Sequence, residues 1–201
     1  MRQDLMCGAM MMAAVGGLAA ERTAAVQRLA LVRDGRPAAS IVIASNATRA
    51  AQFAAEELRE HVKAISGAAL PIVKDEADGS GLRILVGESR ATEALGLPGR
   101  PFEPQEYLVQ FLPDTIVLMG KDADDRSPIT YEADDSGANR NLPDFFEEQG
   151  TCHAVYDFLE QFCGVRWFRP GALGRVCPRA ETLEVAGWDS RRSPEFKHRN
   201  P

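Results

Sequence analysis

The chain has 201 residues, of which 45% are hydrophobic and 26% are charged, and its formal net charge is −6. This is ordinary globular composition, and a chain of this length can bury a sizeable core without disulfides or metals. Binding to nucleic acid requires a basic face, and the acidic balance offers none, so we expect no nucleic-acid partner.

The first 25 residues have the pattern of a secretory signal peptide. Residues 5–20 carry no charge, follow a single arginine, and end in small residues. The run is shorter than the roughly 20 apolar residues that span a bilayer, so no membrane insertion is expected. The alternative is a disordered leader. A signal peptide predicts a secreted or periplasmic protein, and its removal would take Cys7 and leave three of the four cysteines.

The first half of the chain alternates strand and helix patterns. Residues 46–67 have the clearest helical period, with Thr48 or Asn46 as cap, Gly67 as stop, and His61 at the edge of the apolar stripe as a packing residue. A short helix is expected at 89–97. Strands are expected at 26–32 and 40–44, which form a hairpin, at 70–74 and 82–87, and as a second hairpin, 106–120, that turns at Pro113 and Asp114.

Residues 121–149 are acidic and show little periodicity, so we expect a solvated, flexible loop. The spacing of the acids does not fit a calcium-binding loop of the EF-hand type. Phe145 and Phe146, near the end of this segment, are expected to pack back onto the domain.

The stretch GTCHAVYDFLEQFCGVRWFRPG, residues 150–171, is the densest in polar and aromatic residues. Residues 150–162 fit a helix that ends at Gly164 and carries its apolar stripe on Cys152, Val155, Phe158, Leu159 and Phe162, with Cys163 beside it. His153, Asp157 and Glu160 lie on the opposite, polar face.

Three kinds of chemistry can be tested on this helix. Cys152 and His153 are adjacent, so their side chains diverge by about 100° and cannot form a nucleophilic pair. Cys152 and Cys163 lie roughly 16 Å apart along a helix, too far for a disulfide. One helix offers a single histidine beside Asp157 and Glu160, so a solvated face is favoured over a metal site. We therefore expect no catalytic residues, no metal and no cofactor.

Residues 165–168 predict a strand that carries Trp167 between Arg166 and Arg169. Aromatic faces with arginine suit sugar rings and carboxylates, so Arg166 and Trp167 are candidate substrate-binding residues. The alternative is a strand with one core aromatic and exposed arginines. Short strands are also expected at the two ends of residues 173–185.

The segment from Gly150 to Pro178 resembles the N-terminal domain of the α-glucuronidases of glycoside hydrolase family 67, and the earlier strands and helix occur in the order of that domain. A similar domain precedes the barrel of family 20 hexosaminidases. The resemblance implies an α/β (α+β) fold, a mixed sheet with helices packed on it, over residues 26–188. It also implies that residues 189–201 are a truncated lead-in to a missing (β/α)₈ barrel, where Arg199 matches a sugar-contacting arginine.

The expected function is therefore that of a non-catalytic accessory domain of a secreted glycoside hydrolase that acts on polysaccharide such as xylan. Its partners would be the catalytic barrel and carbohydrate. The glycosidase carboxylates lie on the barrel, so the chain alone is expected to be inactive. The alternative is a stand-alone carbohydrate-binding module. A thiol or metal enzyme built on Cys152 and His153 would instead show a depressed thiol pKa or bound metal.

Overall fold

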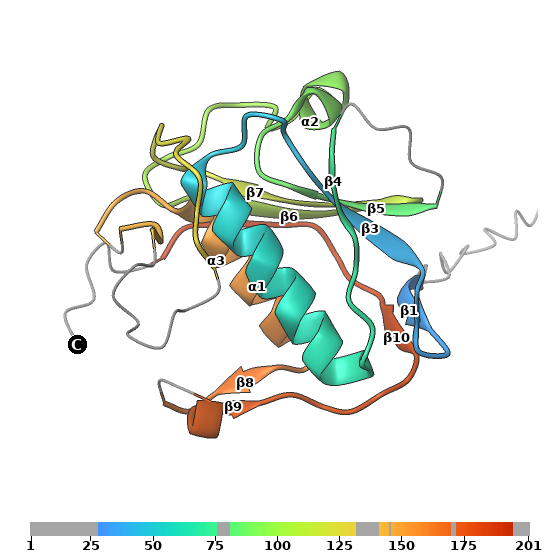
Figure 1. Ribbon diagram of the computed structural model, residues 1–201. Coiled ribbons are helices and arrows are strands. Elements are labelled where there is room, and N and C mark those ends of the chain that lie inside the picture. Colours follow the sequence, from blue (N-terminus) through green and yellow to red (C-terminus); the bar gives the residue numbers. More distant parts are fainter. Residues whose placement is uncertain (1–27, 76–80, 132–140, 145, 170–171, 195–201) are drawn as a thin grey trace, which may run out of the picture.

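The computed structural model describes residues 28–75, 81–131, 141–144, 146–169 and 172–194. The leader, residues 1–25, and Arg199 lie outside the described residues. The described chain forms layers: a central sheet, two long helices on one of its faces, a short helix on the other, and a small hairpin on the far side of the long helices (Figure 1). The expectation of a mixed sheet with helices packed on it is confirmed.

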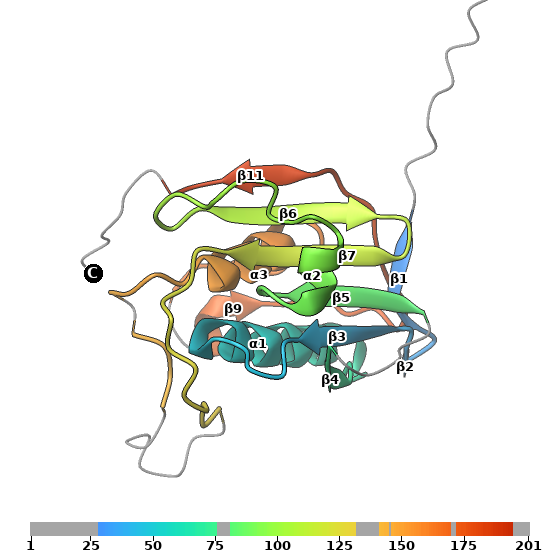
Figure 2. The same cartoon turned by 90° about the horizontal axis from the view of Figure 1, so that it is seen from above.

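The central sheet has six strands in the order β11-β6-β7-β5-β3-β4 (Figure 2). Neighbouring strands among β4, β3, β5 and β7 are parallel, whereas β6 is antiparallel to β7 and β11 is antiparallel to β6. The strand bounds are β3 Ala39–Ile43, β4 Ile72–Lys74, β5 Leu82–Val86, β6 Tyr107–Leu112, β7 Thr115–Gly120 and β11 Ser190–Arg192.

The expected pairing of the first two strands is wrong. β1 (Leu29–Arg33) pairs with the short β2 (Arg36–Pro37) and with β10 (Leu183–Val185) in a separate three-stranded sheet. The next strand, β3, enters the central sheet instead. The physical reason is burial: Ile41 packs on the long-helix side and Val42 on the opposite side, and both are buried, which requires a strand with both faces covered.

The helices follow their sequence signals closely. α1 (Arg49–Ser66) begins at Thr48, whose side chain accepts the backbone N–H of Ala51, and ends at Gly67 in the left-handed conformation. α2 (Arg90–Ala94) begins at Ser89 with a capping box. α3 (Gly150–Gln161) packs beside α1 and across β6 and β7.

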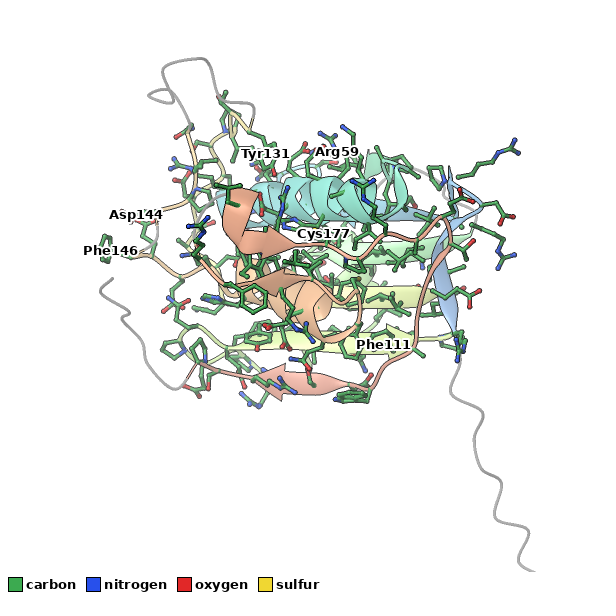
Figure 3. The ribbon with its side chains drawn as sticks, turned by 90° about the horizontal axis from the view of Figure 1, so that it is seen from below. Arg59, Phe111, Tyr131, Asp144, Phe146 and Cys177 are labelled. Atoms are coloured by element: carbon green, nitrogen blue, oxygen red, sulfur yellow. The ribbon has the colours of Figure 1, made fainter. Side chains whose placement is uncertain are left out.

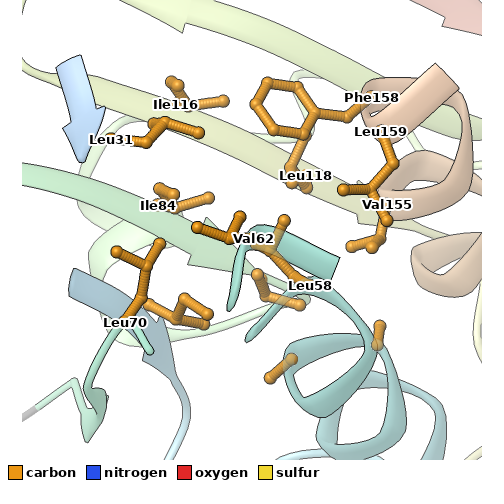
Figure 4. Packing of buried hydrophobic residues seen from close by; sticks show 14 of the residues in the cluster. Leu31, Leu58, Val62, Leu70, Ile84, Ile116, Leu118, Val155, Phe158 and Leu159 are labelled. Atoms are coloured by element: carbon orange, nitrogen blue, oxygen red, sulfur yellow. The ribbon is translucent and has the colours of Figure 1, made fainter. Parts of the chain in front are cut away.

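The main core lies between the sheet and the two long helices. Phe158 and Leu159 of α3 meet Leu58 and Val62 of α1 over Ile84, Ile116 and Leu118 of the sheet, and all of these side chains have no exposed surface (Figure 4). A second, smaller cluster on the other face of the sheet includes Leu85, Val117 and Met119. Both faces of the inner strands β3, β5 and β7 are therefore covered.

The end of β7 and the start of α3 touch through their backbones. A Cβ added to Gly120 would lie 2.5 Å from the Gly150 carbonyl carbon, and one added to Gly150 would lie 2.4 Å from the Lys121 nitrogen. Real Cβ atoms do not come this close to backbone atoms. Glycine at both positions thus allows α3 to begin directly against the strand.

Asp122 joins the starts of both long helices at this edge. Its carboxylate accepts the Thr48 hydroxyl at 2.8 Å, the Thr151 hydroxyl at 2.7 Å and the Thr151 backbone N–H at 2.9 Å. Burial raises the pKa of Asp122 to about 6, although these hydrogen bonds oppose the shift.

The acidic segment after β7 is attached to α1 where the structure describes it. The backbone N–H of Arg49 bonds the carbonyl of Asp125 at 2.6 Å, and the Arg49 guanidinium lies 2.6 Å from the Asp125 carboxylate. Residues 121–131 are thus held along the helix instead of being fully solvated. The expectation that Phe146 packs back is wrong, because 72% of this residue is exposed; Phe145 lies outside the described residues.

The domain extends beyond the expected boundary at residue 188, because β11 is a strand of the central sheet. Arg191 on β11 donates to the buried Glu106 carboxylate at 3.0 Å, and Arg100 donates to it at 2.6 Å. The bond from Arg191 is the main reason that the pKa of Glu106 falls to about 2. β11 runs in the same direction as β7, so it ends at the edge where α1 and α3 begin.

Candidate functional site

A two-stranded hairpin covers the side of α1 and α3 that faces away from the sheet (Figure 1). It consists of β8 (Arg166–Trp167) and β9 (Arg175–Val176), joined through a short 3-10 turn, η1 (Ala172–Gly174). Trp167 is opposite Arg175 and Arg166 is opposite Val176. Since side chains alternate along a strand, Trp167 and Arg175 share one face of the hairpin and Arg166 belongs to the other.

Trp167 packs inward on two rings from the long helices. Its ring centroid lies 5.4 Å from that of His61 and 5.5 Å from that of Tyr156, the latter in an edge-to-face arrangement. It remains 37% exposed. Trp167 is therefore an aromatic residue that is packed on one side against the helices and exposed on the other.

Glu57 on α1 organises the polar side of this cluster. One carboxylate oxygen accepts the Tyr131 hydroxyl at 2.6 Å, and the other accepts the Tyr156 hydroxyl at 2.9 Å. Burial raises the pKa of both tyrosines, and the Glu57 carboxylate adds to the shift. Both phenols therefore stay protonated and donate. Through Tyr131, Glu57 also fixes the acidic segment against the helix (Figure 3).

His61 is buried beneath Trp167, with 1% of its surface exposed. Its Nδ1 lies 2.7 Å from the Glu57 carbonyl, which can only accept, so Nδ1 carries the proton. Nε2 is buried and has no hydrogen-bond partner within the described part of the chain. Burial lowers the pKa of His61, so the ring is neutral near pH 7. It lies in the packed layer, as expected.

Arg166 and Trp167, the two residues expected to contact sugar, alternate along β8 and so belong to opposite faces of the hairpin. The Arg166 guanidinium donates to the Glu160 and Val165 carbonyls at 2.5 and 2.8 Å. It therefore binds carbonyl groups at and just beyond the end of α3. Arg175 is the arginine that shares the face of Trp167. Trp167 and Arg175 are neighbours only through the register between β8 and β9, which the sequence around Trp167 does not indicate.

Cys152 and His153 of α3 do not form a nucleophilic pair, as their helical spacing indicates. The Cys152 thiol is buried and donates to the Ala50 carbonyl at 3.3 Å, and burial raises its pKa well above the ordinary value. His153 points the other way, with its Nε2 3.2 Å from the Gln105 side-chain oxygen. Cys152, Cys163 and Cys177, the cysteines of the described residues, are free.

Within the described residues, no group of three histidine, cysteine or acidic side chains could hold a metal ion. In the same part of the chain, no helix is both long enough and apolar enough to cross a membrane.

The tip and outer face of the hairpin carry exposed apolar side chains. Phe168 is 78% exposed, Leu173 87% and Val176 53%. Scattered apolar residues are normal on a surface, but three within nine residues of one hairpin form a local patch. The sequence gives no signal of this patch, because its three residues are separated by arginine, proline and glycine and show neither helical nor strand periodicity.

No family model and no curated protein matches the sequence. Among solved structures, the chain is similar to a family GH115 4-O-methyl-α-glucuronidase, described as specific for decorated arabinogalactans. The TM-score is 0.56 at 16% sequence identity, and the match covers 85% of this chain but 19% of the glucuronidase. The chain therefore spans about a fifth of that protein.

This likeness supports a glycosidase-like fold and does not support family 67 specifically. The described residues have the fold of one region of a larger glycoside hydrolase.

Proposed function

We propose that this chain is a non-catalytic accessory domain of a secreted or periplasmic glycoside hydrolase, α-glucuronidase-like, that acts on polysaccharide. The observation that carries the proposal is the apolar patch on the β8–β9 hairpin: Phe168, Leu173 and Val176 are exposed on a fold that forms about a fifth of a larger glycosidase. Burial of these side chains against a catalytic barrel would remove them from water.

The chemistry near Trp167 supports a non-catalytic role. Glycoside hydrolysis requires two carboxyl groups that flank the scissile bond about 5–10 Å apart. Glu57 is hydrogen-bonded inside the protein by two tyrosines. Glu60 is ion-paired with Arg59 and with Lys63, each at 3.7 Å. Neither is arranged as a member of such a pair.

A second candidate function, a stand-alone carbohydrate-binding module, is favoured by the exposed part of Trp167. Its ring is held by His61 and Tyr156 and lies on the same face as Arg175, an arrangement that suits a sugar ring with a polar substituent. This function needs no barrel.

The genomic reading frame beyond Pro201 separates the two functions. An in-frame (β/α)₈ barrel supports the accessory domain, whereas a stop codon in a normally expressed gene supports the binding module. The purified chain, residues 26–201, should release no product from aryl glucuronides or glucuronoxylan. Hydrolysis by this chain alone would overturn the accessory role.

If the frame continues, the hairpin can be tested in the longer protein. The double variant Phe168→Ser/Leu173→Ser should loosen the domains and increase limited proteolysis between them. Phe146→Ser is the matched control, because Phe146 is equally exposed but lies outside the hairpin. Equal proteolysis of the two variants would contradict docking through the hairpin.

A further inference from the structure

A cavity of about 350 Å³ opens beside the Trp167 cluster. Its lining comes from three separate parts of the chain: α1, the segment after β7, and β9, which contribute Glu60, Lys63, Ala64, Tyr131 and Arg175. Its volume lies at the lower end of the range for small-molecule sites. Figure 3 shows Tyr131 against the outer side of α1, near Arg59.

The wall of the cavity formed by Tyr131 is fixed before any ligand arrives. The Tyr131 hydroxyl is bound to Glu57 at 2.6 Å, and its ring centroid lies 5.9 Å from that of Phe53. A wall that is already ordered costs a ligand little conformational entropy on binding. The ring of Tyr131 therefore offers a preformed apolar surface.

The charge of the lining favours an anion. Lys63 and Arg175 are positive, and Glu60 is the one acid of the lining. Glu60 is shared by Lys63 and Arg59. Arg175 is exposed and makes no ion pair or side-chain hydrogen bond within the described part of the chain. A guanidinium without a partner presents a planar fork of donors that matches a carboxylate.

From this arrangement we infer that the cavity binds an acidic sugar residue, a hexuronate, whose carboxylate pairs with Arg175 and Lys63. The ring of Tyr131 flanks the sugar ring. Trp167, opposite Arg175 in the hairpin, is a neighbour of the cavity and not part of its lining. Among the described residues, the lining carries two positive groups and one negative group, so its charge suits a monoanion better than a phosphate dianion. That the carboxylate belongs to a sugar rests on the proposed function.

The direct test is a titration of the ¹⁵N-labelled chain with methyl glucuronoside, followed by NMR. Methyl glucoside is the neutral counterpart and inorganic phosphate is the alternative anion. We expect shifts of the Arg175, Lys63 and Tyr131 amides with the glucuronoside, and at least about tenfold weaker binding of the glucoside, because a charge-assisted bidentate contact is lost. Equal affinity for the two sugars, or a preference for phosphate, would overturn the inference.

Variants assign the contact to Arg175. Arg175→Gln should weaken glucuronoside binding at least about tenfold, and Arg175→Lys should weaken it less, because the charge remains without the planar fork. Arg179→Gln is the matched control: the same charge is removed from an exposed arginine four residues away that lines the adjacent hollow, beyond Lys63 and Ala64, and not the cavity itself. Equal effects at 175 and 179 would show a general charge effect and refute the site.

Failure of this test is distinguishable from failure of the proposed function. If the chain binds no glucuronoside but its gene continues into a barrel, the uronate site is refuted and the accessory role is supported. If the chain binds the glucuronoside but its gene ends in a stop codon, the uronate site is supported and the accessory role is refuted.

Discussion

The two sides of the α1–α3 layer are built on opposite principles. The side facing the sheet is dry and apolar, and its side chains, such as Phe158 and Leu58, have no exposed surface. The side facing the hairpin is polar and aromatic, with a carboxylate held by two tyrosines and a tryptophan that is partly in solvent. The first side determines the fold, and the second leaves surface free for a ligand or a partner.

The largest effect is expected on the dry side. Phe158→Ala should lower the free energy of unfolding by about 3–5 kcal/mol, because the cavity left between α3 and the sheet cannot collapse against strands. Urea denaturation followed by circular dichroism measures this loss. Phe146→Ala, at a residue that is 72% exposed, should change it by less than about 0.5 kcal/mol. Similar losses of unfolding free energy in the two variants would contradict the contrast between the buried and the exposed side.

A pH effect is expected where the two helices begin. The pKa of Asp122 is raised from 3.8 to about 6 in the folded protein, so its contribution to stability is complete below pH 3.8 and is lost as the pH rises through 6. The contribution amounts to about 2–3 kcal/mol. Asp122→Asn should remove this decline from the pH dependence of urea unfolding. An unchanged pH profile in the variant would show that Asp122 titrates normally.

The smallest effect on stability is expected on the outer side of the hairpin. Phe168→Ser and Leu173→Ser should each change the free energy of unfolding by less than about 0.5 kcal/mol, because both side chains are already in water. They should also reduce binding of a hydrophobic dye. A loss above about 1 kcal/mol in either variant would mean that the hairpin belongs to the folding core, and the contrast between the two sides would fail.

The dry side was largely predictable from the sequence. The stripe of α1, its cap at Thr48 and stop at Gly67, and the hairpin at Pro113 all follow local signals that act over a few residues. The wrong pairing of β1 with β3 shows the limit of such signals. A strand pattern shows that a segment is extended, but which neighbour it meets depends on the burial of both of its faces.

The candidate site was predictable only in part, because long-range contacts assemble it. Trp167 was identified from its sequence context, but its pairing with Arg175 depends on strand register, and the Tyr131–Glu57 bond joins residues 74 positions apart. The sugar contact expected of Arg166 remains a prediction, and in the structure its guanidinium donates to two backbone carbonyls. Arg199 lies outside the described residues, so its role also remains a prediction.

The contact between Gly120 and Gly150 bears on what the GT at the start of α3 means. Any side chain at either position would displace the helix from the strand, so both glycines are required for a reason unrelated to chemistry. Gly150 and Thr151 open α3, and Thr151 binds Asp122 in the same joint. A glycine–threonine pair at this position therefore reports how the helix is seated on the sheet, and it carries no information about catalysis.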